Sequence, residues 1–226
     1  MKYLLWLTMF SLSLTSCGDF FQFEEKPNKW DGVTMKILND SPYVMVGDSM
    51  PLKVKYNAPD SLKDTAVYWM IGDNTYAHLQ NDTLLALQPG QTELTAIGGG
   101  GHLSDKCNVN IIDRWKTDDF NRMHPSDMVI YADIKVDGEQ WNDSTKIIGA
   151  FVRGELAGLA IKREAFGIRY AEMRIWALAD HHVGRVEIRC YDRRKFHLYI
   201  FREEIEFSAT RTLGTLSNLY PINFVK

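Results

Sequence analysis

Cysteine is scarce in this sequence, and the short motifs that mark common catalytic sites are missing. Its three cysteines, Cys17, Cys107 and Cys190, lie far apart and form neither a Cys-x-x-Cys pair nor a Cys/His metal spacing. There is no Gly-x-Ser-x-Gly turn, and the glycines at 98–101 are followed by neither a helical pattern nor Lys-Ser/Thr. The sequence therefore predicts a non-enzymatic protein with no cofactor and no bound metal.

An excess of positive charge is also missing. The chain carries 26 Lys and Arg residues against 29 Asp and Glu residues, for a formal net charge of −3. Proteins that bind nucleic acid usually present a basic surface, so we expect no nucleic-acid partner. Hydrophobic content of 45% and charged content of 24% are ordinary for a globular protein.

The apolar run at the start of the chain is too short to cross a membrane as a helix. Lys2 precedes the uncharged segment Tyr3–Leu14, whereas a spanning helix needs about 20 apolar residues. A positive start, a short apolar core and small residues after it are typical of a secretory signal peptide. We predict a signal peptide over residues 1–16.

Leu14-Thr15-Ser16-Cys17 resembles the lipobox of bacterial lipoproteins, in which small residues precede a cysteine that is lipidated and becomes the new N-terminus. The resemblance implies that Cys17 is a lipid anchor, that residues 17–32 are a tether, and that the membrane is a partner through this lipid. The alternative is a plain secretory signal beside an incidental cysteine.

The tether carries acidic residues directly after Cys17, namely Asp19, Glu24 and Glu25. Such a patch resembles the signal that sends lipoproteins of some Gram-negative bacteria to the outer face of the outer membrane. A solvated linker is the alternative. We expect an outer-membrane protein, with exposure at the cell surface or on the periplasmic face left open.

Residues 33–113 read as short strands separated by turn residues every 8–12 positions, the pattern of an all-β sandwich. The order of signals resembles bacterial immunoglobulin-like domains of group 2. Val46-Gly47-Asp48 precedes a strand, Trp69 lies in the third strand, and Leu84–Leu87 leads into Gln88-Pro89-Gly90. The resemblance implies a spacer or adhesive module of the cell surface, with Trp69 in its core.

Residues 128–226 predict a second β module after a polar linker over 114–127, whose Trp115 and Phe120 are expected to pack at the joint. Strict alternation from Met128 to Val136 indicates a half-buried strand, and Arg153-Gly154 sits between two apolar runs as a tight hairpin. Tyr170–Leu178 alternates with a period near two, which favours a strand over a helix. Further along, Phe196, Leu198 and Ile200 are expected to continue the sheet.

The segment Ile148–Ala160, reading IGAFVRGELAGLA, resembles a motif of small β-sandwich modules in secreted and surface proteins of anaerobic Gram-negative bacteria. The resemblance implies a non-catalytic accessory module. The small residues also have a mechanical reason, because Gly149 and Gly158 would let neighbouring strands approach closely.

Trp141, in the polar segment 138–144, is the leading candidate for ligand contact. An exposed tryptophan in a polar loop can stack on a sugar ring or a protein partner, whereas the alternative is a ring folded back onto the sandwich. Trp176 is the second candidate. Cys107 and Cys190 either form one disulfide or stay free as small buried side chains.

The sequence thus predicts an all-β, lipid-anchored protein with two tandem β-sandwich domains, the first immunoglobulin-like. The expected function is non-catalytic adhesion or binding, with a cell-surface glycan or a protein as partner. The alternative is an accessory glycan-binding lipoprotein of a polysaccharide-uptake system, which predicts Trp141 and Trp176 in one flat exposed patch. The ligand and the oligomeric state are left open.

Overall fold

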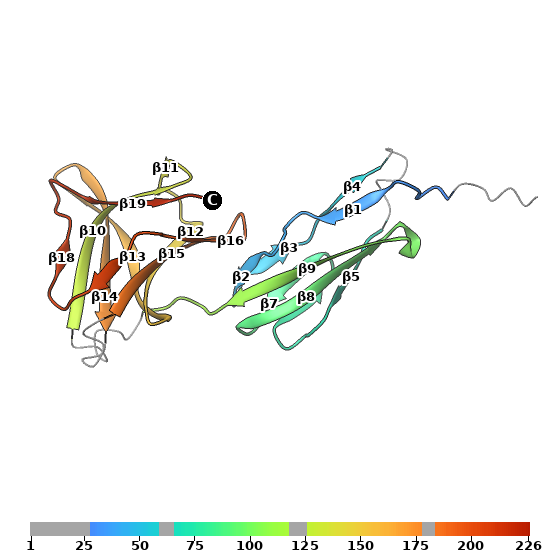
Figure 1. Ribbon diagram of the computed structural model, residues 1–226, viewed down its shortest axis with the longest axis horizontal. Helices are drawn as coiled ribbons and strands as arrows, with labels where there is room; N and C mark the ends of the chain where they lie inside the picture. The colour runs from blue at the N-terminus through green and yellow to red at the C-terminus, as the bar shows by residue number, and fades with distance from the viewer. Residues whose placement is uncertain (1–27, 59–65, 118–125, 178–183) are drawn as a thin grey trace, which may run out of the picture. The chain divides into compact units, whose positions relative to one another are not determined.

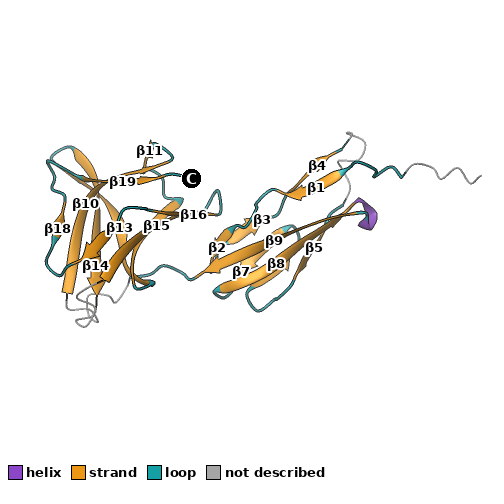
Figure 2. Ribbon diagram, in the orientation of Figure 1, coloured by secondary structure: helices purple, strands orange, loops and turns teal. Residues whose placement is uncertain are grey.

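The computed structural model describes residues 28–58, 66–117, 126–177 and 184–226 (Figure 1). The predicted signal peptide, Cys17 and most of the tether lie outside the described residues, as does most of the predicted linker, including Phe120. The chain divides into one unit that ends at Asp31 and a second that runs from Gly32 to Lys226. The described part of the second unit is built from β-strands and one short 3-10 turn, Gly99–Gly101 (Figure 2). No helix in the described ranges is long and apolar enough to cross a bilayer.

The strands up to residue 112, which we call the first half, pair with one another. They are β1 (Thr34–Ile37), β2 (Tyr43–Met45), β3 (Ser49–Pro51), β4 (Val54–Asn57), β5 (Tyr68–Ile71), β6 (Ala77–Gln80), β7 (Thr83–Ala86), β8 (Gly90–Gly98) and β9 (Leu103–Ile112).

The strand order in the first half is that of an immunoglobulin-like sandwich. One sheet has the order β2-β9-β8-β5, with β2 parallel to β9, and another has the order β3-β7-β6; β1 and β4 form a further two-stranded ladder. The chain passes from β3 in one sheet to β5 in the other, returns for β6 and β7, and closes with β8 and β9. This alternation between two largely antiparallel sheets is the immunoglobulin arrangement, so the fold predicted for the first half is confirmed.

Burial in the first half follows the predicted alternation, with one difference at Trp69. Cys107, Val109 and Ile111 lie buried on one face of β9. Trp69 was expected in the core but is only half-buried, and its indole N–H donates to Asp82 Oδ1 at 3.2 Å. The reason is that β5 is an edge strand with only β8 beside it, so its side chains lie at the margin of the sandwich.

The strands from residue 126 onward, which we call the second half, form one continuous sheet. They are β10 (Ser126–Val136), β11 (Glu139–Gln140), β12 (Lys146–Val152), β13 (Glu155–Ala165), β14 (Ile168–Ala177), β15 (Gly184–Asp192), β16 (His197–Ile200), β17 (Ile205–Phe207), β18 (Thr212–Leu213) and β19 (Tyr220–Phe224).

The long strand β13 lets this sheet fold over its own core. Its first part pairs with β12 as far as Leu159, and its second part pairs with β14 from Ala160 onward. The main order is β11-β10-β14-β13-β12-β15-β16, with β18 and β19 beside β10 and β17 beside β15. Buried apolar side chains from both parts of the sheet, among them Ile130, Met173 and Ile188, form one core cluster.

Most of the pattern predicted for the second half is confirmed. Alternate residues of β10, from Met128 to Val136, are buried, and β14 is a strand. In β16, Tyr199 is buried, while Ile200 is 50% exposed. Leu198 and Ile200 lie in β16 and continue the sheet as predicted, whereas Phe196 lies just before this strand. The phenol ring of Tyr199 fills the core, and its hydroxyl reaches the margin to donate to Asp137 Oδ2 at 2.8 Å.

Gly158 allows the close approach of two strands that the sequence predicted. A Cβ atom at this position would lie 2.2 Å from the carbonyl oxygen of Arg174, a backbone atom of β14. At Gly149 a Cβ would meet the side chains of Leu156, Phe151 and Trp115 at 3.0–3.2 Å. Both glycines therefore make room, Gly158 for a backbone and Gly149 for packed side chains.

A second apolar cluster contains side chains from both halves. Met45 of the first half and Tyr191 of the second are buried with Trp115 and Phe151, and the Trp115 ring lies 5.2 Å from that of Phe151 in an edge-to-face contact. The Met45 amide donates to the Tyr191 hydroxyl at 3.2 Å. Trp115 thus packs where the sequence predicted a joint.

Candidate functional site

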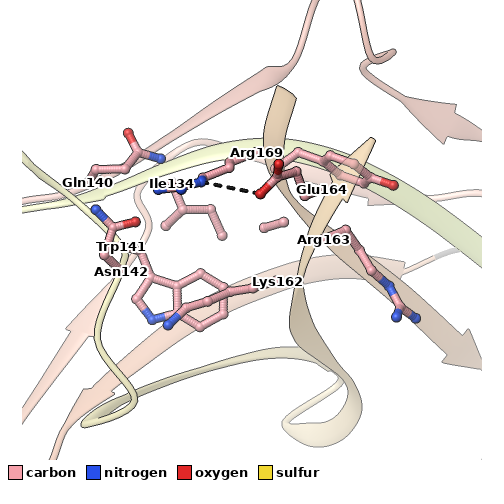
Figure 3. A pocket seen from close by; sticks show the side chains of 10 residues that line it. Ile134, Gln140, Trp141, Asn142, Lys162, Arg163, Glu164 and Arg169 are labelled. Atoms are coloured by element: carbon pink, nitrogen blue, oxygen red, sulfur yellow. Dashed lines mark hydrogen bonds and ion pairs between the residues drawn. The ribbon is translucent and has the colours of Figure 1, made fainter. Parts of the chain in front are cut away.

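A cavity of about 560 Å³ lies in the second half where β10 separates from β14. Pairing between these strands ends at Ala132 and Ala171, and β10 then pairs with β11 from Lys135 onward. The gap between the diverging strands is lined by side chains of β10, β13 and β14 and by the segment 140–142 (Figure 3). We call it the Trp141 cavity.

Trp141 is folded back on the sandwich, which is the alternative that the sequence left open. Only 9% of the residue is exposed, and it belongs to the core cluster. Its indole N–H donates to the Lys146 carbonyl at 3.1 Å, and Lys162 Nζ lies 4.6 Å from the ring centroid (Figure 3). The expectation of an exposed tryptophan was wrong, because the indole has an apolar contact and a hydrogen-bond acceptor inside the fold. Trp141 therefore forms part of the cavity wall and is not an exposed platform.

Polar groups surround this wall. Asn142 and Gln140 are exposed, and the Gln140 side-chain amide donates to Asp133 Oδ1 at 2.8 Å. Glu164 and Arg169 form an ion pair at 3.4 Å, drawn as a dashed line in Figure 3, with side chains 60% and 80% exposed. A surface pair of this kind is weak, so both groups are available to a ligand at little cost.

A network around Asp143 holds the segment that presents Asn142. Asp143 Oδ1 accepts from the Thr145 amide and hydroxyl at 2.8 and 2.6 Å, and Oδ2 contacts Lys146 Nζ at 2.6 Å. The hydrogen bond from Lys146 and those from Thr145 hold the pKa of the Asp143 carboxyl well below its usual range. The cavity wall next to Asn142 is therefore pre-organised.

Trp176 lines a different cavity, of about 410 Å³, on the outer face of β13 and β14. Its ring is half-buried, and the Arg174 guanidinium carbon lies 5.7 Å from the ring centroid. The two candidate tryptophans thus do not share one flat patch, because one is a wall of the Trp141 cavity and the other belongs to this Trp176 cavity. Arg163 lines both cavities.

Sequence reasoning missed Arg163 and Tyr170, which lie opposite each other on β13 and β14. A signal for Tyr170 was present. Ala171, Met173 and Ile175 alternate as the buried face of β14, so residues 170, 172, 174 and 176 must share the other face. Arg163 had no such signal. It lies in the part of β13 beyond Ala160, where the motif Ile148–Ala160 ends.

The two described cysteines are free. Cys107 and Cys190 are both buried, and burial raises the pKa of the thiols to about 11 and about 12. Of the two alternatives, free buried thiols hold and the disulfide does not.

No family model and no curated protein matches the chain. Among solved structures, surface layer protein SbsC, domains 1–6, has a TM-score of 0.32 and 14% identity, over 77% of this chain and 26% of that chain. The ICAM-5 D1–D4 ectodomain fragment has a TM-score of 0.28 and 13% identity, over 80% of this chain and 51% of that chain. A third is SGBP-B of the Bacteroides ovatus mixed-linkage glucan utilization locus, in complex with a mixed-linkage heptasaccharide. Its TM-score is 0.23 and its identity 14%, over 77% of this chain and 47% of that chain. The chain thus spans about a quarter to half of the length of these structures, and likenesses this weak carry no functional argument.

Proposed function

We propose that this protein is a non-catalytic binding protein of the outer membrane, held by a lipid on Cys17. Residues 33–113 serve as a group 2 immunoglobulin-like stalk, and residues 114–127 link it to a module over 128–226. That second module binds the ligand, and its site is the Trp141 cavity.

The observation that carries the proposal is the composition of this cavity. Its volume of about 560 Å³ is within the range of small-molecule sites. Trp141 contributes a ring, while Gln140 and Asn142 contribute amides that both donate and accept hydrogen bonds. The cavity lining holds one carboxylate, that of Glu164, whereas acid/base hydrolysis of a glycoside uses two. The arrangement favours binding over catalysis.

Of the two expected partners, a glycan and a protein, the lining favours a glycan. Sugar rings present apolar C–H faces to aromatic rings and hydroxyl groups to amide and charged side chains. The second candidate function is therefore an accessory glycan-binding lipoprotein of a polysaccharide-uptake system. It differs from a protein-directed adhesin in the partner, not in the site.

A glycan array tests the proposal, with the mature chain 17–226 carrying Cys17→Ser so that no lipid is attached. Asn142→Ala is the informative variant, because Asn142 is exposed and lines the cavity without supporting the core. Asn108→Ala, an exposed amide on β9, is the matched control. Binding that Asn142→Ala weakens and Asn108→Ala spares supports the proposal. Binding that neither variant changes would place the site elsewhere.

The anchor is tested separately in cells of a Gram-negative host. The unaltered chain is expected to incorporate labelled fatty acid and to fractionate with the outer membrane, since lipid chains contribute about 0.8 kcal/mol per buried CH₂. Cys17→Ser should abolish both, whereas Cys107→Ser should leave both unchanged. Labelling that survives Cys17→Ser would refute the lipoprotein assignment.

A further inference from the structure

We infer that the free edge of β5 pairs with the same edge of a second copy of this chain, in an antiparallel two-fold contact centred on Met70. The pairing joins two first halves and does not involve the Trp141 cavity, which lies in the second half. Within the described ranges, β5 is the last strand of its sheet, with β8 on one side and no strand on the other (Figure 1).

The edge of β5 lacks the charged residues and prolines that usually keep sheet edges from pairing. Residues 66–72, which read AVYWMIG, contain neither. Other strand edges of this chain do carry such residues, namely Lys36 on β1, Lys55 on β4, Pro51 on β3 and Pro221 on β19. The sequence of β5 therefore permits a pairing that those edges resist.

The ladder between β5 and β8 indicates which backbone groups of β5 are open. The Gly72 amide donates at 2.9 Å to the carbonyl of Glu93, the residue that the register places opposite. In an antiparallel pair, hydrogen-bonded positions alternate with positions whose N–H and C=O groups point away from the neighbour. Counting back from Gly72, Met70 bonds to β8. Trp69 and Ile71 therefore present their N–H and C=O groups to the free edge.

The side chains of β5 would also be covered by a neighbouring strand. Tyr68 is 68% exposed and Met70 is 57% exposed on the outer face of the sheet. Trp69 and Ile71 share the inner face with buried residues of β8, yet both are only half-buried because no strand flanks them. A further strand would remove apolar surface from water on both faces, which favours association.

A second copy supplies a strand that fits this edge in register. With the two-fold axis at Met70, Trp69 of each copy lies opposite Ile71 of the other, and each such pair exchanges two backbone hydrogen bonds. An aromatic ring opposite a β-branched side chain is a favourable cross-strand pair. The two Met70 side chains meet on the outer face. Each lies diagonal to a Tyr68 ring, and sulfur–aromatic contacts are favourable.

An extended segment of another protein is the competing occupant, and the composition of the edge argues against it. Complementary charges usually select one partner and fix its register. Because β5 offers no charge, its complement is an equally apolar strand with open backbone groups. Native proteins seldom leave such strands exposed, whereas a second copy always brings one. The contact closes at two copies, because each chain uses its single β5 edge.

Sedimentation velocity of the chain 17–226 carrying Cys17→Ser tests the inference. We expect a monomer–dimer equilibrium with a dissociation constant of about 10–100 µM, because strands of four residues make a small interface. Met70→Lys and Met70→Glu should each weaken the dimer at least about tenfold, since each places like charges opposite one another at the axis. Ile161→Lys is the matched control, because Ile161 is 51% exposed but lies on β13.

Mixing the two charged variants locates the axis. An equimolar mixture of Met70→Lys and Met70→Glu should associate at least about tenfold more tightly than either variant alone, because opposite charges then face each other. Neither variant should unfold the monomer, since the Met70 side chain is exposed. Circular dichroism of each variant checks this.

Hydrogen exchange by NMR distinguishes backbone pairing from contact between side chains. The Trp69 and Ile71 amides should exchange more slowly as the protein concentration rises. The Met70 amide should change little, because it already bonds to β8 in the monomer. Slower exchange at none of these amides, in a sample that does dimerise, would overturn the edge pairing.

The remaining failures are distinguishable. A monomer at every concentration would overturn pairing with a second copy and leave the edge to an extended segment of another protein. A dimer that Ile161→Lys weakens as much as Met70→Lys would place the contact elsewhere. A dimer weakened by both charged variants and not restored by mixing them would overturn the two-fold register. None of these results affects the glycan array with Asn142→Ala, so the proposed function is tested independently.

Discussion

Phe166 combines two properties that a stable hairpin tip avoids. It lies between β13 and β14 with φ of +53°, followed by Gly167 at +76°, and the residue is 95% exposed. Two positive φ angles in succession are typical of a type I′ turn, where asparagine and aspartate are preferred. The comparable hairpin tips in this half use Asp137 and Arg153. A bulky aromatic residue is strained in this conformation and gains no burial here.

Phe166→Asn is therefore expected to stabilise the protein. Asparagine tolerates a positive φ, so the free energy of unfolding should rise by about 1 kcal/mol. Urea unfolding followed by circular dichroism measures this. Phe166→Leu is the control, because leucine removes the ring without relieving the backbone and should give no gain. A loss of stability in Phe166→Asn would contradict this expectation, because it would mean that the Phe166 ring makes stabilising contacts with the rest of the protein.

Asp143 should make stability depend on pH. Its folded pKa lies below the ordinary value of 3.8, so its stabilising effect is complete above that value and is lost as pH falls through the folded pKa. Asp143→Asn should lower the free energy of unfolding at pH 7 by about 1 kcal/mol, since solvent screens part of the Lys146 ion pair. Below about pH 4 the difference should shrink.

A double-mutant cycle with Lys146→Gln separates the ion pair from the turn. Asparagine keeps an oxygen for the Thr145 hydrogen bonds, so the cycle reports mainly on charge. An absence of coupling at pH 7 would contradict the assignment of the ion pair.

At the scale of strands, the sequence predicted β10, β12 and β14 well, because local alternation sets which face is buried. It could not predict that β13 runs to Ala165 and pairs with β12 and then with β14. Lys162, Arg163 and Glu164 are polar on both faces, so periodicity carries no information there. The part of the candidate site contributed by β13 was therefore invisible.

Gly158→Ala tests the close approach of β13 and β14. A Cβ would lie 2.2 Å from the Arg174 carbonyl oxygen, and backbone atoms cannot move aside as a flexible side chain can. We expect a loss of about 3 kcal/mol or more in the free energy of unfolding. Gly72→Ala is the matched control, because its nearest atoms would lie at 3.5 Å, an ordinary contact. Equal stability of the two variants would contradict the close approach.

For the molecule as a whole, the joint between the halves was predictable only in part. Trp115 in a polar segment indicated a buried anchor, and it is buried. Its partners were not predictable, because Met45 and Tyr191 are 146 positions apart and each reads as an ordinary strand residue. Arg193 also reaches Asp48 through two nitrogens, both at 3.0 Å. Two-nitrogen contacts of this kind are the stronger class of ion pair.

Tyr191→Phe should weaken this joint, and the effect should be measurable at the Met45 amide. The Met45 amide donates to the Tyr191 hydroxyl at 3.2 Å within a buried cluster, so removing the hydroxyl leaves a buried N–H without its partner. The cost should be about 1–3 kcal/mol. Hydrogen exchange by NMR should show faster exchange of the Met45 amide in this variant. Tyr199→Phe is the control, since its hydroxyl bonds Asp137 inside the second half and should leave Met45 unchanged. If Met45 exchanges equally fast in the unaltered chain and in Tyr191→Phe, the hydrogen bond does not hold the halves together, and the joint depends on the Trp115 ring contacts alone.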